Sequence, residues 1–117
     1  MATFGDILRD RRRVAGISQR DLAAKIGVDF SYISKLENGR LAPPATDTTG
    51  RIAKALNCAV EDLLAAAGKF PSGVEDAIAS EPAAIRFLQK AVDLDLTQSE
   101  WERMLSRLES LRGQRRG

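Results

Sequence analysis

The sequence has 117 residues, which is the length of one ordinary domain or of a small domain with an appendage. It has 18 Lys and Arg, 16 Asp and Glu, no histidine and a single cysteine, and 44% of its residues are apolar. These counts disfavour zinc fingers, histidine metal sites and Ser-His or Cys-His catalysis, so we expect no metal, no cofactor and no enzyme. Without about 18 consecutive apolar residues or a signal-peptide core, we expect no membrane segment, and the lone cysteine suits a protein of the reducing cytoplasm.

The first helix is predicted over residues 4–15. Thr3 is its expected cap, and Gly16 is expected to end it. Helical spacing of the apolar residues predicts one inward face, formed by Phe4, Ile7, Leu8 and Val14.

Two short helices are predicted next, over residues 19–26 and roughly 30–38. Ser18 and Asp21 form a capping box for the second helix, Gly27 ends it, and Asp29 is the expected cap of the third. About three residues around Gly27 join the two helices, which is the spacing of a helix-turn-helix motif. Their expected inward residues are Leu22, Ala23, Ile26, Ile33 and Leu36.

Helices four and five are predicted over residues 47–56 and 60–67, after a loop that contains two prolines. Asn57 is the expected left-handed cap of the fourth helix, and Ala59 is a poor capping residue for the fifth. Cys58 lies between these helices; we expect a small buried side chain, with a redox sensor as the alternative. The expected inward residues are Ile52, Ala53, Leu56, Leu63 and Leu64.

A turn-rich break over residues 68–73 divides the chain into predicted regions 1–69 and 70–117. Beyond the break, helices are predicted near 74–80 and 82–93, and a last helix follows a capping box formed by Thr97 and Glu100. The last helix carries an apolar stripe formed by Trp101, Met104, Leu105, Leu108 and Leu111. The expected fold class is all-α, with a five-helix N-terminal domain followed by about three short helices.

The segments SQRDLAAKIGVDFSYISKLENGR (18–40) and RIAKALNCAVEDLL (51–64) resemble the lambdoid phage repressor and Cro family, also called the Xre family. The resemblance covers residues 4–68 and implies a lambda-repressor-like DNA-binding domain whose third helix lies in the major groove. Residues 1–70 carry 11 Lys and Arg against 8 Asp and Glu, a mildly basic balance that suits double-stranded DNA as the partner.

The resemblance implies that outward side chains near the start of the third helix contact base edges. The candidates are Phe30, Ser31, Ser34 and Lys35. Serine hydroxyls donate or accept hydrogen bonds, Lys35 can reach guanine or a phosphate, and Phe30 can pack on a thymine methyl group. The alternative for Phe30 is that it fastens the third helix to the second.

Contacts with the DNA backbone are expected from a second set, formed by Gln19, Tyr32, Asn38, Arg40 and Arg13. In the family the residue at Gln19 binds a phosphate together with the helix N-terminus. The alternatives are an ordinary helix-start residue at Gln19, a packing role for Tyr32, and simple solvation of Arg40 and Arg13. Arg11 is expected to be simply solvated.

One predicted pair is structural. Family members join an arginine of the first helix to the glutamate of the LENG motif, and Arg12 and Glu37 stand at the matching positions. We expect this ion pair to fasten the first helix to the third.

The apolar stripe of the last helix must be buried against something. We expect a homodimer interface formed by Trp101, Met104, Leu105 and Leu108, because two DNA-binding units one helical turn apart multiply the DNA contacts. The alternative is that the stripe covers the N-terminal core.

The predicted function is sequence-specific binding of double-stranded DNA by a transcriptional regulator, a repressor acting as a homodimer on a palindromic operator. The alternative is an antitoxin-like or peptidase-controlled regulator whose C-terminal helices bind a toxin or a metallopeptidase.

Overall fold

The computed structural model describes the backbone of residues 2–116 and the side chains of residues 2–113. Within that range the chain forms helices and no strands, so the predicted all-α class is confirmed. The helices are α1 (Phe4–Ala15), α2 (Gln19–Ile26), α3 (Phe30–Glu37), α4 (Thr46–Leu56), α5 (Val60–Ala67), α6 (Val74–Ala79), α7 (Pro82–Asp93) and α8 (Gln98–Arg116). None of these described helices has the length and apolar character needed to cross a membrane.

The chain divides into two compact units between Glu75 and Asp76. The predicted boundary, between residues 69 and 70, lies slightly earlier. We call residues 1–75 the N-terminal unit and residues 76–117 the C-terminal unit. Helices α1–α5 belong to the first, α7 and α8 belong to the second, and the boundary falls within α6.

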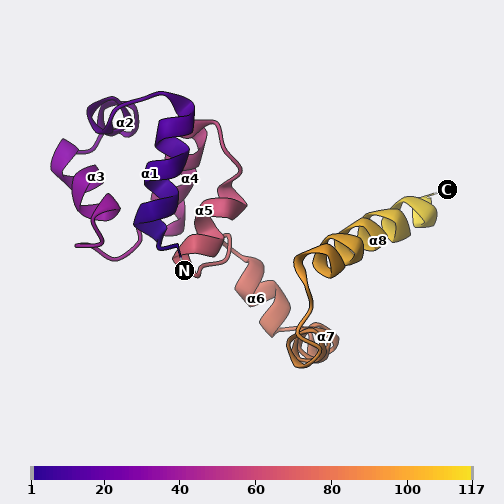
Figure 1. The fold of residues 1–117 in the computed structure, drawn as a ribbon. Helices are drawn as coiled ribbons and strands as arrows, with labels where there is room; N and C mark the ends of the chain where they lie inside the picture. The colour runs from indigo at the N-terminus through magenta and orange to yellow at the C-terminus, as the bar shows by residue number, and fades with distance from the viewer. Residues whose placement is uncertain (1, 117) are drawn as a thin grey trace. The chain divides into compact units, whose positions relative to one another are not determined.

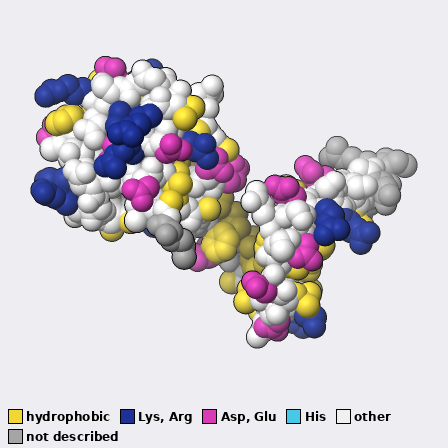
Figure 2. All heavy atoms as spheres, in the orientation of Figure 1, with side chains coloured by type: hydrophobic (Ala, Val, Ile, Leu, Met, Phe, Trp, Pro, Cys, Tyr) yellow, Lys and Arg dark blue, Asp and Glu magenta, His cyan; other side chains and the backbone are white. Residues whose placement is uncertain are grey.

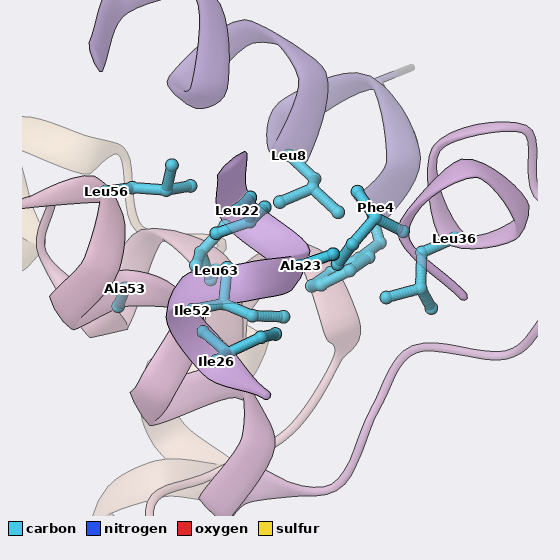
Figure 3. Packing of buried hydrophobic residues seen from close by; sticks show 11 residues of the cluster. Phe4, Leu8, Leu22, Ala23, Ile26, Leu36, Ile52, Ala53, Leu56 and Leu63 are labelled. Carbon is cyan, nitrogen blue, oxygen red and sulfur yellow. The ribbon is translucent and has the colours of Figure 1, made fainter. Parts of the chain in front are cut away.

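In the N-terminal unit five helices enclose one hydrophobic core. Helix α1 packs against α3, α4 and α5, while α2 packs against α3 and α4 (Figure 1). Figure 3 shows core side chains from all five helices pointing toward one another. The buried apolar residues of this core are Phe4, Leu8, Leu22, Ala23, Ile26, Ile33, Leu36, Ile52, Ala53, Leu56 and Leu63. Full burial of a Leu or Ile side chain stabilises the fold by roughly 1.5–3 kcal/mol, so this cluster fixes how the helices meet.

The prediction that Val14 faces inward is wrong, because 78% of its surface is exposed. Val14 follows the half-buried Ile7 by seven residues, so it lies at the edge of the inward face, in the last turn of α1, and away from the buried Phe4 and Leu8. Ile7 is half-buried and packs against the core as expected.

Local capping explains where the first helices begin and end. Thr3 and Asp6 form a reciprocal capping box on α1, and Ser18 and Asp21 form another on α2. Gly27 ends α2 in the left-handed conformation with φ of 73°, which a residue with a side chain rarely adopts.

The caps of α3 and α4 differ from these two capping boxes. Asp29 occupies the N-cap position of α3, but its side chain makes no capping hydrogen bond, and its carboxylate accepts a bond from the Ser31 hydroxyl instead (3.2 Å). Asn57 ends α4 in the left-handed conformation, as predicted, with φ of 53°.

The C-terminal unit contrasts with this packed core. Within residues 76–113 only the side chain of Ala91 is buried. Thr97 and Glu100 form the predicted capping box at the start of α8, and every residue from Trp101 to Gly113 is exposed. The unit therefore folds into helices without a core of its own among the described residues.

Candidate nucleic-acid interface

Helices α2 and α3 form a helix-turn-helix whose turn is held from two sides. The backbone N–H of Val28, just after Gly27, donates to the carbonyl of Ala23 at 2.9 Å. From α4, the guanidinium of Arg51 donates to the carbonyl of Ile26 at 2.9 Å. These bonds satisfy carbonyl groups that the end of α2 would otherwise leave unpaired, and they fix the direction in which α3 departs.

The expected ion pair between Arg12 and Glu37 is present. Arg12 Nε donates to Glu37 Oε2 at 2.7 Å and Arg12 Nη2 donates to Glu37 Oε1 at 3.1 Å, a two-point contact. The Glu37 side chain is fully buried, and that of Arg12 is 13% exposed. Arg12 Nη1 also donates to the carbonyl of Ile17, so this arginine links α1, the α1–α2 turn and α3.

Two further donors reach the same carboxylate. Gln19 Nε2, at the start of α2, donates to Glu37 Oε1 at 3.0 Å, and Arg9 Nε lies 3.4 Å from that oxygen. Glu37 thus accepts hydrogen bonds from α1 and from α2. We call Arg9, Arg12, Gln19 and Glu37 the Glu37 cluster.

Arg9 was missed by the sequence reasoning. Its Nη2 atom lies 3.3 Å from both the Glu37 carbonyl and Asn38 Oδ1, so it also binds the C-terminal end of α3. The available signal was its position three residues before Arg12, because residues at that spacing share a helix face.

The Glu37 cluster sets the charge state of its central carboxylate. Burial by itself raises the pKa of Glu37, but hydrogen bonds from Arg12, Gln19 and Arg9, with the charge of Arg12, outweigh burial and hold this pKa below its ordinary value. The hydrogen bond with Glu37 in turn raises the pKa of Arg12. The cluster therefore keeps a charged carboxylate at the buried end of α3.

The four predicted base-contacting residues have different surroundings. Ser31 and Lys35 are exposed, while Ser34 is half-buried near Asn38, whose Nδ2 lies 3.5 Å from its hydroxyl. Phe30 is 37% exposed, and the guanidinium carbon of Arg20 lies 4.6 Å from the centroid of its ring. Phe30 thus connects α3 to α2, as the alternative interpretation of this residue supposes.

The five predicted phosphate-contacting residues also differ. Arg13, Asn38 and Arg40 are exposed, while Gln19 is half-buried and bonded to Glu37. Tyr32 is half-buried, and its ring packs against the core. Figure 2 shows Lys and Arg side chains in separate groups on the visible face of the N-terminal unit, with acidic side chains between them.

Arg11 is not simply solvated, which corrects the expectation for this residue. Its guanidinium donates to Asp62 Oδ2 at 3.1 Å and so links α1 to α5. The side chains of Arg11 and Asp62 are 37% and 48% exposed, so solvent weakens this pair.

The four predicted dimer-interface residues lie on the exposed surface of α8. Trp101 is 41% exposed and Leu108 is 63% exposed. They line an open apolar groove of about 590 Å³ within the C-terminal unit. Its lining residues are Ile78, Ala84, Phe87, Leu88, Trp101, Met104, Leu105, Arg107, Leu108 and Leu111.

Known proteins share both the sequence and the architecture of this chain. The family model HTH_3, helix-turn-helix, matches residues 8–63. An uncharacterised HTH-type transcriptional regulator of Mycobacterium tuberculosis, Rv0474, is 38% identical over 99 residues, which cover 81% of this chain and 69% of that protein. The HTH-type transcriptional regulator DdrOP3 of Deinococcus deserti is 33% identical over 116 residues, which cover 92% of this chain and 81% of that protein. The HTH-type transcriptional repressor RghR of Bacillus subtilis is 33% identical over 96 residues, which cover 82% of this chain and 70% of that protein.

Among solved structures, a chain of the SinR protein/SinI protein complex is similar in fold, with a TM-score of 0.53 and 19% identity. The match covers 95% of this chain and 99% of that one. The helix-turn-helix geometry and the named relatives agree on one assignment. The chain belongs to the Xre-like family of helix-turn-helix proteins and is a DNA-binding transcriptional regulator.

Proposed function

We propose that this regulator binds a palindromic operator as a homodimer, with α3 of each copy in the major groove, and that it represses transcription from the occupied site. The observation that carries the proposal is the division of α3 into two faces. Ile33, Leu36 and Glu37 are buried and held by the rest of the domain, whereas Ser31 and Lys35 point to solvent. A rigid helix with a free polar face suits contacts with base edges.

The hydrogen bonds of the two serines give them opposite preferences for bases. The Ser31 hydroxyl donates to Asp29, so toward DNA it accepts, which suits the amino groups of adenine or cytosine. The Ser34 oxygen is approached by the amide of Asn38, which leaves its own O–H to donate to guanine or to thymine O4. Lys35 adds a donor for guanine or for a phosphate.

In this proposal, the phosphate contacts come from residues that surround the base-contacting side chains of α3. Asn38 and Arg40 follow α3, and Gln19 begins α2, where the helix N-terminus also favours an anion. Because the Gln19 amide already donates one hydrogen bond to Glu37, it has one N–H left for a phosphate. Arg13 and the Tyr32 hydroxyl complete the proposed set.

Selection of binding sites from random duplex DNA with the purified full chain, at two salt concentrations, tests the proposal. An enriched palindrome with half-sites about one helical turn apart supports a dimeric reader. Salt-sensitive binding without an enriched sequence contradicts it, since phosphate contacts alone carry no sequence information.

We propose that the apolar groove of the C-terminal unit is covered by a second copy of the chain, through Trp101, Met104, Leu105 and Leu108. Only Ala91 is buried within residues 76–113, so these helices lack a core and need a partner surface to be stable. Two linked DNA-binding units also gain effective concentration on neighbouring half-sites.

Sedimentation of Leu105→Asp tests the homodimer. The variant is expected to be monomeric, because a carboxylate would be buried in the interface. Ser106→Asp adds the same charge at an exposed residue that does not line the groove, and it is expected to remain dimeric. The proposed interface would be contradicted if the Leu105→Asp protein were still a dimer, or if the wild-type protein were a monomer at high concentration.

A different protein is the second candidate for this surface. The solved structure with a similar fold is a complex of two proteins, SinR and SinI. A toxin or a metallopeptidase would then occupy the groove, and the DNA-binding unit would act in the same way. Co-purification of a second protein that Leu105→Asp abolishes, with a monomeric wild type, would favour this alternative.

A further inference from the structure

We infer that Arg20 contacts the DNA backbone at the operator and that Phe30 serves as the ring that holds it in place. The inference rests on the proposed docking of α3 and adds to it a residue that the sequence reasoning did not single out. Its basis is the 4.6 Å between the guanidinium carbon of Arg20 and the centroid of the Phe30 ring. This separation lies well inside the range of a cation–π contact.

The contact joins the starts of the two helices of the motif. Arg20 is the second residue of α2 and Phe30 is the first residue of α3. Both are exposed, so the stacked pair lies on the surface and contributes little to the core. A surface stack between these two helix starts lies on the side of the motif that approaches DNA in helix-turn-helix docking.

Arg20 is free to bind a ligand, unlike most neighbouring arginines. Arg9 and Arg12 are bound to Glu37, Arg11 is paired with Asp62, and Arg51 donates to a backbone carbonyl. By contrast, the side chain of Arg20 makes no hydrogen bond or ion pair with the residues that the structure describes. Its positive charge and its N–H donors therefore remain available.

The Phe30 ring prepares this guanidinium for binding. The guanidinium carbon lies over the ring of Phe30, and a guanidinium held over a ring in this way can still direct N–H groups at two phosphate oxygens. A side chain that is already held loses less rotamer freedom on binding than a free arginine does. We assign the ligand as a phosphate because the first helix of the motif crosses the DNA backbone, while α3 faces the bases.

The role of Phe30 changes accordingly. One face of its ring is covered by Arg20, so its contribution to DNA binding passes through that arginine. Phe30 is then a positioning residue, and direct packing on a thymine methyl group becomes the competing explanation. The two explanations differ in whether replacing Phe30 still weakens DNA binding when Arg20 has already been replaced.

A double-mutant cycle with the full chain separates them. Fluorescence anisotropy would compare wild type, Arg20→Ala, Phe30→Ala and the double variant, each on the selected operator and on a scrambled duplex, over a range of salt. Lys25→Ala is the matched control, since Lys25 is an exposed cation on α2 without a stacked ring. Arg20→Lys keeps the charge without the planar fork, and thermal melting of each variant reports its folding.

We expect Arg20→Ala to weaken binding about tenfold or more on both duplexes, because a hydrogen bond to a charged group is lost. The slope of log K against log salt should fall by about 0.9, as for one phosphate contact, and Arg20→Lys should retain most of that slope. Phe30→Ala should weaken binding less, and it should add nothing in the Arg20→Ala background. Lys25→Ala should change neither affinity nor slope.

Two results would overturn the inference. Unchanged affinity and salt slope in a folded Arg20→Ala protein would remove Arg20 from the interface. A loss for Phe30→Ala that persists without Arg20, with altered preference at one base position, would mean that Phe30 contacts a base directly. Lys35→Ala distinguishes these outcomes from a failure of the proposed docking: if Lys35→Ala leaves base preference and affinity unchanged as well, α3 is not in the groove.

Discussion

Gly5 of α1 lies directly against the last carbonyl groups of α3. A Cβ atom placed on Gly5 would come 2.5 Å from the carbonyl oxygen of Glu37 and 2.7 Å from that of Leu36. Both neighbours are backbone atoms that cannot rotate away. The first turn of α1 therefore approaches the end of α3 as closely as only glycine permits.

Gly5→Ala is expected to destabilise the protein by about 1–3 kcal/mol, the usual cost of forcing extra volume into a close contact. Urea denaturation measures the change. Gly50→Ala is the control, because Gly50 lies inside α4 and its Cβ would have nothing within 4 Å. That substitution should stabilise the protein by about 0.5–1 kcal/mol through higher helix propensity. A Gly5→Ala protein as stable as wild type would show that α1 can move away from α3 at no cost.

Arg12→Ala should cost about 3 kcal/mol of the free energy of unfolding, near the lower end for a broken buried pair, since Arg9 and Gln19 still donate to Glu37. Replacing both partners, as in Arg12→Met with Glu37→Leu, should cost less than the two single changes together. Denaturant titration of the full cycle provides these values.

The matched control for this cycle is Arg11→Ala, because Arg11 forms an exposed pair with Asp62 on the same helix. It should cost no more than about 1 kcal/mol. Equal losses for Arg11→Ala and Arg12→Ala would mean that burial adds nothing to the Arg12–Glu37 pair.

The lowered pKa of Glu37 predicts how stability depends on pH. A carboxyl group whose pKa is lower in the folded state than in the unfolded chain stabilises the fold above its unfolded pKa, about 4.3, and this contribution disappears as pH falls through the folded value. Glu37→Gln cannot make that contribution. The stability difference between wild type and Glu37→Gln should be constant near neutral pH and should shrink below about pH 4. Urea titrations from pH 7 to pH 3 would detect it, and a difference that widens with acid would reverse the assigned direction.

Arg40→Ala and Lys35→Ala should change DNA binding in different ways. Loss of a phosphate contact at Arg40 is expected to weaken binding by a similar factor on every sequence. Loss of Lys35 should alter preference at one or two base positions, at about 1–3 kcal/mol for a good contact. Binding selections with each variant measure both effects. A changed consensus sequence for Arg40→Ala would mean that Arg40 contacts a base. An unchanged consensus sequence for Lys35→Ala would mean that Lys35 does not.

The helices were predictable because the signals that define them are local. Glycine stops such as Gly16 and Gly27, and capping boxes such as that of Ser18 and Asp21, place helix ends within a residue or two of those observed. Helical spacing also identified the buried apolar side chains of α2, α4 and α5, but not the buried Thr49 of α4. It was wrong for Val14, where the apolar character of the residue was not matched by its position on the helix.

The interactions that position the interface were less predictable, because they join residues far apart in the sequence. The pair of Arg12 with Glu37 followed from a family resemblance. Spacing places Arg9 beside Arg12 on α1, but nothing in the sequence indicates that Gln19 of α2 reaches the same carboxylate. The stack of Arg20 on Phe30 likewise depends on how α2 and α3 cross. Such contacts become visible only once the helices have been placed.

The two faces of α3 bear on how a regulator of this kind can acquire a new target. Ser31 and Lys35 lie outside the core, so in the proposed docking their replacement changes the groups presented to DNA with little effect on folding. Glu37 is bound from α1 and α2 at once, so a change there disturbs the whole domain. Specificity can therefore diverge between gene copies through a few outward substitutions, while the inward residues stay fixed. The same separation makes the outward face of α3 the part to randomise when retargeting this protein to a chosen operator.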